Sequence, residues 1–186
     1  MKKILFVIDM QNDFIDGALG SEDAKKIVPN VVNLINTFHE DNPNDMVFYT
    51  LDTHYENYLD TLEGKKLPIK HCVENTPGHD LNIDIQRTIA NNLHLSKCFC
   101  KETFGSLNMI NEAANYLWEN IKSNDECIIV GLCSDICVLE NAMLLRAKFP
   151  NLKITCYENC CAGTSKEAHN AAMLVMKSCQ IDVKRF

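Results

Sequence analysis

Three residues with complementary chemistry are Asp9, Lys101 and Cys137, each at or just after the end of an apolar segment. A cysteine in the first turn of a helix lies at the positive end of the helix dipole, and a nearby lysine further favours its nucleophilic thiolate. A carboxylate such as Asp9 can take the thiol proton and later donate it to a leaving amine. Each residue alone also has a structural explanation, so this prediction of a Cys-Asp-Lys triad depends on the fold bringing them together.

A second polar group lies in the stretch that begins at Asp52 and contains His54, Glu63 and His71. Carboxylates and imidazoles of this kind can bind a borderline divalent ion. The alternative is that both histidines are ordinary surface residues of a polar loop.

Apolar runs of strand length recur along the chain and are typical of strands covered on both faces. The predicted strands are Ile4 to Ile8, Met46 to Leu51, Lys97 to Lys101, Cys127 to Leu132, Leu152 to Tyr157 and, more weakly, Ile181 to Lys184. Apolar residues spaced three or four apart between these runs predict helices. The predicted helices are Ala24 to Phe38, Leu107 to Ile121, Ile136 to Ala147 and Lys166 to Ser178. Thr164 and Glu167 predict a capping box at the start of the last helix.

The alternation of strands and helices predicts one domain over residues 1–186, a three-layer α/β/α fold with a central, mostly parallel sheet. In such sheets ligands bind beyond the carboxyl ends of the strands, where Asp9, Asp52, Lys101 and the segment leading to Cys137 are expected. Only the polar stretch from Thr53 to Ile85 resists the pattern, and its length predicts a functional loop.

Composition narrows the class of protein. The 186 residues carry a formal net charge of −7, which disfavours nucleic acid and anionic membranes as partners. No apolar run approaches the roughly 20 residues of a membrane span, and no signal peptide is recognisable. The ten cysteines are therefore expected to be mostly free thiols of a cytoplasmic protein.

Three motifs, in order along the chain, together resemble the isochorismatase-like cysteine hydrolase superfamily, and within it the nicotinamidase/pyrazinamidase branch. They read IDMQNDF at residues 8–14, KETFGS at residues 101–106 and GLCSDICV at residues 131–138. The set is specific, whereas any one motif alone is not, and with the turn at residues 162–164 the resemblance covers nearly the whole chain.

The resemblance implies that Asp9, Lys101 and Cys137 form a catalytic triad that hydrolyses a small amide to an acid and ammonia through a thioester. It also implies a cis peptide bond between Leu132 and Cys133, with the backbone N–H groups of Cys133 and Cys137 forming an oxyanion hole. The thiol of Cys133 should then matter little.

For the metal, the resemblance implies a divalent ion, Zn, Fe or Mn, held by Asp52, His54 and His71. Glu63 is expected as the fourth ligand, because the second loop histidine of the commonest branch is absent. Phe14 and Leu132 are expected to contact the substrate. The tryptophan that the family carries just before the last histidine is absent here, where the chain reads Leu67 to Lys70. This departure argues against nicotinamide as the substrate more than against amide hydrolysis itself.

Two other functions stay open. One is a related cysteine hydrolase that acts on another small amide or carbamoyl compound. The other is a non-catalytic, thiol-rich binding or redox module that uses Cys133 and Cys137, although such a module has no need of Asp9 and Lys101. The family habit predicts a homo-oligomer.

Overall fold

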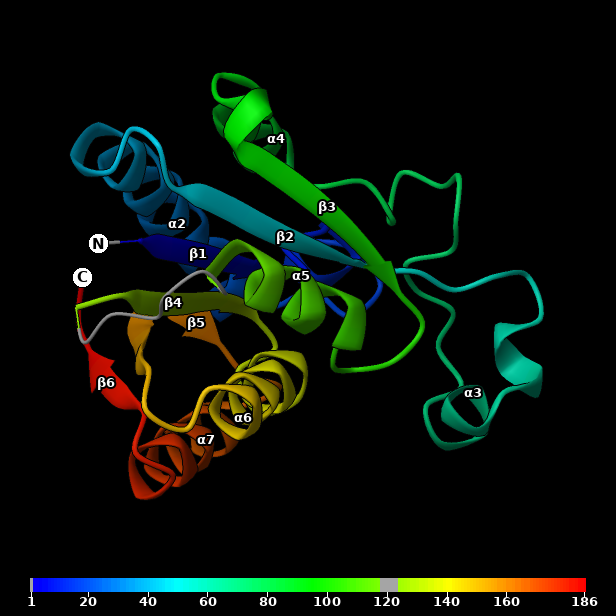
Figure 1. Cartoon of the computed structure of the whole chain (residues 1–186). Coiled ribbons are helices and arrows are strands. Elements are labelled where there is room, and N and C mark those ends of the chain that lie inside the picture. The colour runs from blue at the N-terminus through cyan, green and yellow to red at the C-terminus, as the bar shows by residue number, and fades with distance from the viewer. Residues whose placement is uncertain (1, 118–123) are drawn as a thin grey trace.

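A parallel sheet forms the centre of the computed structural model, which describes residues 2–117 and 124–186 (Figure 1). Within these residues the strand order is β3-β2-β1-β4-β5-β6, and every neighbouring pair is parallel. The strands are β1 (Lys3–Ile8), β2 (Met46–Asp52), β3 (Ser96–Lys101), β4 (Glu126–Leu132), β5 (Lys153–Ala162) and β6 (Asp182–Lys184). The chain order reverses between β1 and β4, which makes their carboxyl ends the expected place for a ligand.

Helices cover both faces of the sheet and complete the predicted three-layer α/β/α fold (Figure 1). One face carries α2 (Glu22–Asp41) and α4 (Ile83–Ala90), which contact each other. The other carries α5 (Leu107–Leu117), α6 (Cys137–Lys148) and α7 (Lys166–Ser178), with α6 in contact with both of its neighbours. The short helices are α1 (Asn12–Ile15), η1 (Tyr58–Asp60), α3 (Leu62–Lys66) and η2 (Leu93–Leu95). No helix in the described ranges is both long and apolar enough to span a membrane.

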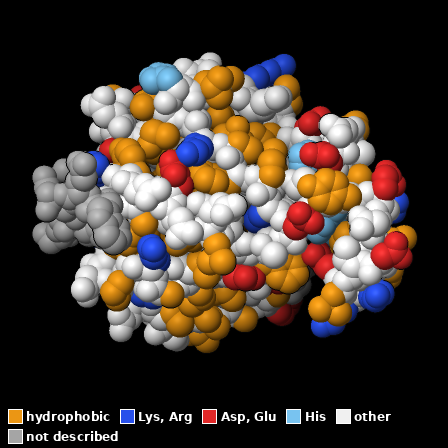
Figure 2. All heavy atoms as spheres, turned by 45° about the vertical axis from the view of Figure 1, so that its right-hand side comes forward, with side chains coloured by type: hydrophobic (Ala, Val, Ile, Leu, Met, Phe, Trp, Pro, Cys, Tyr) orange, Lys and Arg blue, Asp and Glu red, His pale blue; other side chains and the backbone are white. Residues whose placement is uncertain are grey.

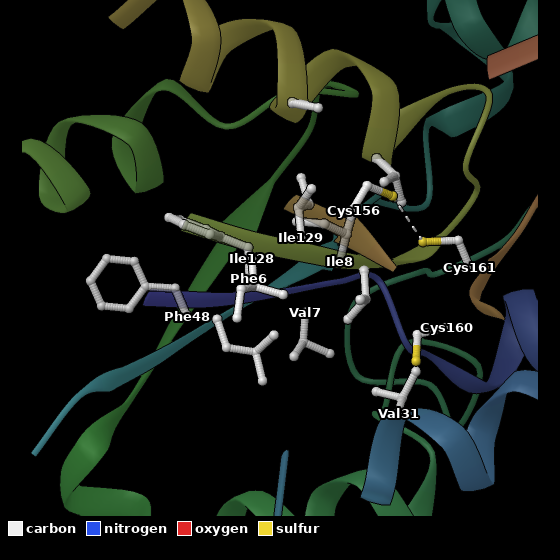
Figure 3. Packing of buried hydrophobic residues seen from close by; sticks show 14 of the residues in the cluster. Phe6, Val7, Ile8, Val31, Phe48, Ile128, Ile129, Cys156, Cys160 and Cys161 are labelled. Carbon is white, nitrogen blue, oxygen red and sulfur yellow. Dashed lines mark hydrogen bonds between the residues drawn. The ribbon is translucent and has the colours of Figure 1, made fainter. Parts of the chain in front are cut away.

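The core lies on both sides of the central strands. Residues Ile4–Ile8 of β1 are fully buried, as their unbroken apolar run predicts. Val7 lies on the side of the sheet that faces Val31 of α2, and Ile129 of β4 lies on the opposite side (Figure 3). This burial fixes the central strands and therefore the positions of the residues that follow them.

The last long strand is longer than predicted. β5 continues past Tyr157 to Ala162, because its pairing with β4 shifts register between Ile129 and Gly131 and then resumes. The polar residues around Glu158 interrupt the apolar pattern, and this hides the continuation in the sequence. The shift brings the buried sulfur atoms of Cys156 and Cys161 to 3.7 Å (Figure 3).

The segment that follows β2 is more ordered than the predicted loop. It contains η1 and α3, and its end already belongs to α4, a helix that the sequence reading missed. Asn82 caps α4 by accepting a hydrogen bond from the backbone N–H of Asp84 at 3.1 Å. The helix predicted over Leu107 to Ile121 is present as α5 up to Leu117, and the remaining residues of that prediction lie outside the described ranges.

The capping box predicted at Thr164 is wrong. Ser165 is the N-cap of α7, and its Oγ accepts a hydrogen bond from the N–H of Ala168 at 3.1 Å. Thr164 instead donates its hydroxyl hydrogen to Asp135 at 2.6 Å. Local sequence would assign Thr164 to the cap, but its hydroxyl is bonded to Asp135 in the loop after β4, and the next residue caps the helix instead.

Gly131 marks the close approach of β1 and β4. It has φ +122°, which side chains rarely permit, and a Cβ atom there would meet the carbonyl oxygen of Ile8. The two central strands therefore require glycine just before the loop that leads from β4 to α6.

Candidate active site

The predicted catalytic residues converge at the carboxyl ends of three strands. Asp9 follows β1 with φ 48°, Lys101 is the last residue of β3, and Cys137 is the first residue of α6. The Nζ atom of Lys101 lies 2.7 Å from Oδ2 of Asp9 and 3.6 Å from Sγ of Cys137. The structure thus brings together the three side chains that the sequence singled out.

Lys101 also contacts Asp52, the last residue of β2 and its register partner, at 3.2 Å between Nζ and Oδ1. Burial by itself lowers the pKa of Lys101. The opposing effects of Asp9, Cys137 and Asp52 together outweigh it, so the pKa of Lys101 lies well above its ordinary value. Lys101 is therefore a permanent cation at the centre of the cluster.

Burial also governs the proton affinities of the two other groups. It raises the pKa of the Asp9 carboxyl above its ordinary value, although the charge of Lys101 opposes this. It raises the pKa of the Cys137 thiol well above its ordinary value, and the charge of Asp9 adds to the effect. Lys101 favours the thiolate, as the sequence predicted, but burial outweighs it, so the pKa of the Cys137 thiol is raised and not lowered.

Two residues to which the sequence analysis gave no role hold the carboxylate of Asp9 and the backbone of Asp52 in place. Thr50 of β2 donates its hydroxyl hydrogen to Oδ1 of Asp9 at 2.6 Å. Gln11 accepts from the backbone N–H of Asp52 and donates to its carbonyl oxygen, at 2.8 and 2.9 Å. A lone threonine inside an apolar strand is the signal that could have identified Thr50.

The loop after β4 presents unused backbone donors. The peptide bond between Leu132 and Cys133 is cis, as the resemblance implied. The carbonyl oxygen of Cys133 accepts hydrogen bonds from the N–H groups of Ile136 and Val138, both at 3.1 Å. Within the described ranges the N–H groups of Cys133 and Cys137 donate to no other atom, which leaves both free to bind a ligand.

Three of the four predicted metal ligands form a tight buried group. One donor atom each from Asp52, His54 and His71 lies within 4.8 Å of the others. Oδ2 of Asp52 is 3.0 Å from Nε2 of His54 and 3.5 Å from Nε2 of His71. Glu63 is more exposed and lies further out, with Oε1 3.8 Å and 3.7 Å from the same two nitrogens.

The donor atoms fit a cation. Nδ1 of His71 lies 2.8 Å from the carbonyl oxygen of Ile69, which can only accept, so in the neutral ring the lone pair of Nε2 faces Asp52. Nε2 of His54 is buried and makes no hydrogen bond among the described residues. Lone pairs of two imidazoles and a carboxylate that converge in a buried place are the ligand set expected of a borderline divalent ion.

Loop contacts support this cluster. The buried ring of Tyr58 lies 4.6 Å from the ring of His54 and 5.0 Å from that of His71, measured between centroids. The N–H of His54 donates to the carbonyl oxygen of Cys72 at 2.9 Å, and the N–H of Cys72 donates to Asp13 at 2.7 Å. Contacts within the loop therefore fix the positions of both imidazoles.

A cavity of about 910 Å³ opens over both groups. Phe14 and Leu132, which we expect to contact the substrate, line it together with Cys137. Phe14 also packs edge-on against His71, with centroids 5.5 Å apart. Figure 2, which turns the right-hand end of Figure 1 forward, shows histidine and acidic side chains gathered on that side. Glu102 and Glu140, which the sequence analysis did not consider, lie among the lining residues.

Solved structures of amidases are similar over nearly the whole chain. Nicotinamidase from Bacillus subtilis has 27% identity and a TM-score of 0.84, with 100% of both chains covered. Pyrazinamidase of Pyrococcus horikoshii in complex with zinc has 26% identity and a TM-score of 0.75, with 99% of both chains covered. N-carbamoylsarcosine amidase from Thermoplasma acidophilum, at 23% identity, shares the fold with a TM-score of 0.77 over 100% of this chain and 96% of that one.

No curated protein matches the chain. The family model described as the isochorismatase domain matches residues 3–184. The match includes all three motifs of the sequence analysis and the residues of the cluster under the cavity. The protein therefore belongs to the isochorismatase family.

Proposed function

We propose that this protein is a cysteine-dependent amidohydrolase that converts a small amide to an acid and ammonia. The observation that carries the proposal is the buried contact of Lys101 with both Asp9 and Cys137, of which Cys137 lines the cavity. A binding module does not require a buried cation between a carboxylate and a thiol, whereas nucleophilic catalysis by a cysteine uses all three groups.

In the first half of the reaction, Asp9 takes the proton of the Cys137 thiol while Sγ attacks the amide carbonyl carbon. This timing follows from the raised pKa of Cys137, because the thiol gives up its proton only as the new bond forms. The N–H groups of Cys133 and Cys137 bind the oxyanion. Asp9 then protonates the leaving nitrogen, the C–N bond breaks, and ammonia leaves a thioester on Cys137.

In the second half, Asp9 accepts a proton from water as the water oxygen attacks the thioester carbon. The C–S bond breaks, the Cys137 sulfur regains a proton, and the acid is released. Lys101 keeps its charge throughout and balances Asp9 in the buried site.

For the metal, Asp52, His54 and His71 would hold a divalent ion, with Glu63 as an outer fourth ligand. The mixed nitrogen and oxygen set suits Zn, Fe or Mn, and the similar Pyrococcus horikoshii structure contains zinc. When bound, the ion supplies a positive centre that holds a ring nitrogen of the substrate.

The substrate we favour is a nicotinamide-like or pyrazinamide-like aromatic amide. Phe14 would offer a ring face, Leu132 an apolar wall, and the ion held by Asp52, His54 and His71 a partner for a ring nitrogen. A larger amide is a second candidate, since about 910 Å³ lies near the top of the usual range for small-molecule sites. A homo-oligomer and a cytoplasmic location stay predictions.

The test is ammonia release by the purified protein from nicotinamide, pyrazinamide, benzamide and a carbamoyl amino acid, with and without a chelator. Release from the two ring-nitrogen amides supports the proposal. Release from the carbamoyl compound alone would favour the related hydrolase, and no release from any of the four would contradict amide hydrolysis.

A further inference from the structure

Two of the three residues between the proposed oxyanion donors, Ser134 and Asp135, are hydrogen-bonded to the end of β5 and to the segment that begins α7. Ser134 is fully buried, and its N–H donates to the carbonyl oxygen of Ala162 at 2.8 Å. Its hydroxyl shares a hydrogen bond of 3.0 Å with Nδ1 of His169 on α7. Asp135 accepts hydrogen bonds from the N–H and the hydroxyl of Thr164, at 2.9 and 2.6 Å.

Gly163 shows how closely these parts fit. A Cβ atom on Gly163 would lie 2.6 Å from Oδ1 of Asp135 and 2.9 Å from both Oγ of Ser134 and the backbone nitrogen of His169. No side chain fits between the loop and the start of α7. The loop is therefore held against the helix by direct contact as well as by hydrogen bonds.

The hydrogen bond of His169 is not needed to form its own helix. Ser165 caps α7, and the N–H of His169 donates to the carbonyl oxygen of Ser165 at 2.9 Å. Burial lowers the pKa of His169, although nearby carboxylates, chiefly Glu158 and Asp135, oppose this. The neutral ring is thus available to orient Ser134.

We propose that His169 is a positioning residue that aims the Cys133 N–H at the oxyanion by fixing Ser134. The strand pairing of Leu132 with Ala162 holds the peptide before Cys133, and the contacts of Ser134 hold the peptide after it. A donor displaced by a fraction of an ångström stabilises the developing negative charge less. This inference depends on the proposed function.

The first test compares His169→Leu with His169→Asn, because the Asn amide can occupy the place of Nδ1. We expect His169→Leu to lower kcat about 10- to 100-fold with KM unchanged, since only the transition state carries the oxyanion. His169→Asn should restore most of kcat. Asn170→Leu, at the next and exposed position of α7, is the matched control and should match the wild type.

The second test asks whether His169 acts through Ser134. We expect Ser134→Ala to lower kcat to a similar extent, and the double variant with His169→Leu to be no worse than either single variant. Additive losses would mean that the two residues act independently and would overturn the proposal.

The third test separates positioning from general damage to the site. Iodoacetamide alkylates Cys137 without forming an oxyanion, and peptide mass spectrometry can follow that residue alone. We expect the alkylation rate of His169→Leu to equal that of the wild type while kcat falls. A parallel loss of both, or wild-type kcat in His169→Leu, would overturn the positioning role and leave amide hydrolysis standing. A wild-type protein that hydrolyses no amide would overturn both proposals.

Discussion

The strand ends and the loop after β2 contribute to the cavity in different ways. Asp9 follows the buried central strand β1 and Lys101 ends the edge strand β3, so both positions depend on the pairing of the whole sheet. His54 and His71 are placed by local contacts inside the segment at residues 53–82, chiefly through Tyr58 and the carbonyl oxygen of Ile69. The part we assign to chemistry is thus positioned by the sheet, whereas the part we assign to substrate recognition depends on its own short-range contacts.

Asp52 joins the two regions, because each of its oxygens faces one of them. Oδ1 lies 3.2 Å from Nζ of Lys101, and Oδ2 lies 3.0 Å from Nε2 of His54. Bond cleavage and substrate selection should therefore be separable by mutation on either side of Asp52 but not at Asp52 itself.

The strongest test of this division removes the nucleophile. We expect Cys137→Ala to lower kcat about 1,000-fold or more while the thermal midpoint stays close to that of the wild type. The lost side chain is one thiol at the wall of a cavity. Cys98→Ala, at an exposed cysteine of β3, is the control. Ammonia release and circular dichroism measure the two effects, and appreciable turnover by Cys137→Ala would exclude the triad.

The base comes next. We expect Asp9→Asn to lower kcat about 100- to 10,000-fold, since an amide cannot accept the thiol proton. Asparagine tolerates the left-handed backbone at φ 48°, so the fold should be retained. Steady-state kinetics and thermal unfolding are the measurements. If the variant kept the wild-type kcat, a group other than Asp9 would have to be the base.

On the loop side, we expect His54→Ala to lose the metal and to raise KM for nicotinamide and pyrazinamide about tenfold or more. KM for benzamide, which lacks the ring nitrogen, should change much less. Elemental analysis is read beside the kinetics, with His94→Ala at an exposed position as the control. Equal losses for all three amides would place the ion in the chemical step and remove the distinction between the two regions.

The smallest effect is expected at the thiol of Cys133. Burial raises the pKa of this thiol to about 12, which keeps it unreactive, and only the backbone N–H is assigned a role. Cys133→Ala should therefore retain most of the wild-type kcat. A loss as severe as that of Cys137→Ala would point to a redox pair instead.

The strand ends could be predicted from the sequence and the supporting contacts could not. Unbroken apolar runs identify buried parallel strands, and the residues that follow them must share one edge of the sheet. The positions of Asp9, Lys101 and Asp52 could be predicted in this way. Thr50 and His169 act through hydrogen bonds between elements distant in sequence, and no local pattern reports such contacts.

The same limit explains the errors. Thr164 has the residue type and spacing of a cap, but its bond to Asp135 belongs to the tertiary structure. The balance of charge and burial at Cys137 likewise depends on how completely the folded core excludes water. The sequence indicates which ionisable groups lie near the site, while their pKa values depend on burial and neighbouring charges in the folded structure.

Gly131 suggests how this architecture can diverge during evolution. Any side chain there would push against the Ile8 carbonyl and separate the two strands that carry the proposed base and the proposed nucleophile. The loop after β2 meets no comparable restriction at positions such as Leu62 and Ile69, whose side chains are exposed. Descendants of this chain could therefore acquire new substrates by changing the loop, while selection retains glycine at residue 131.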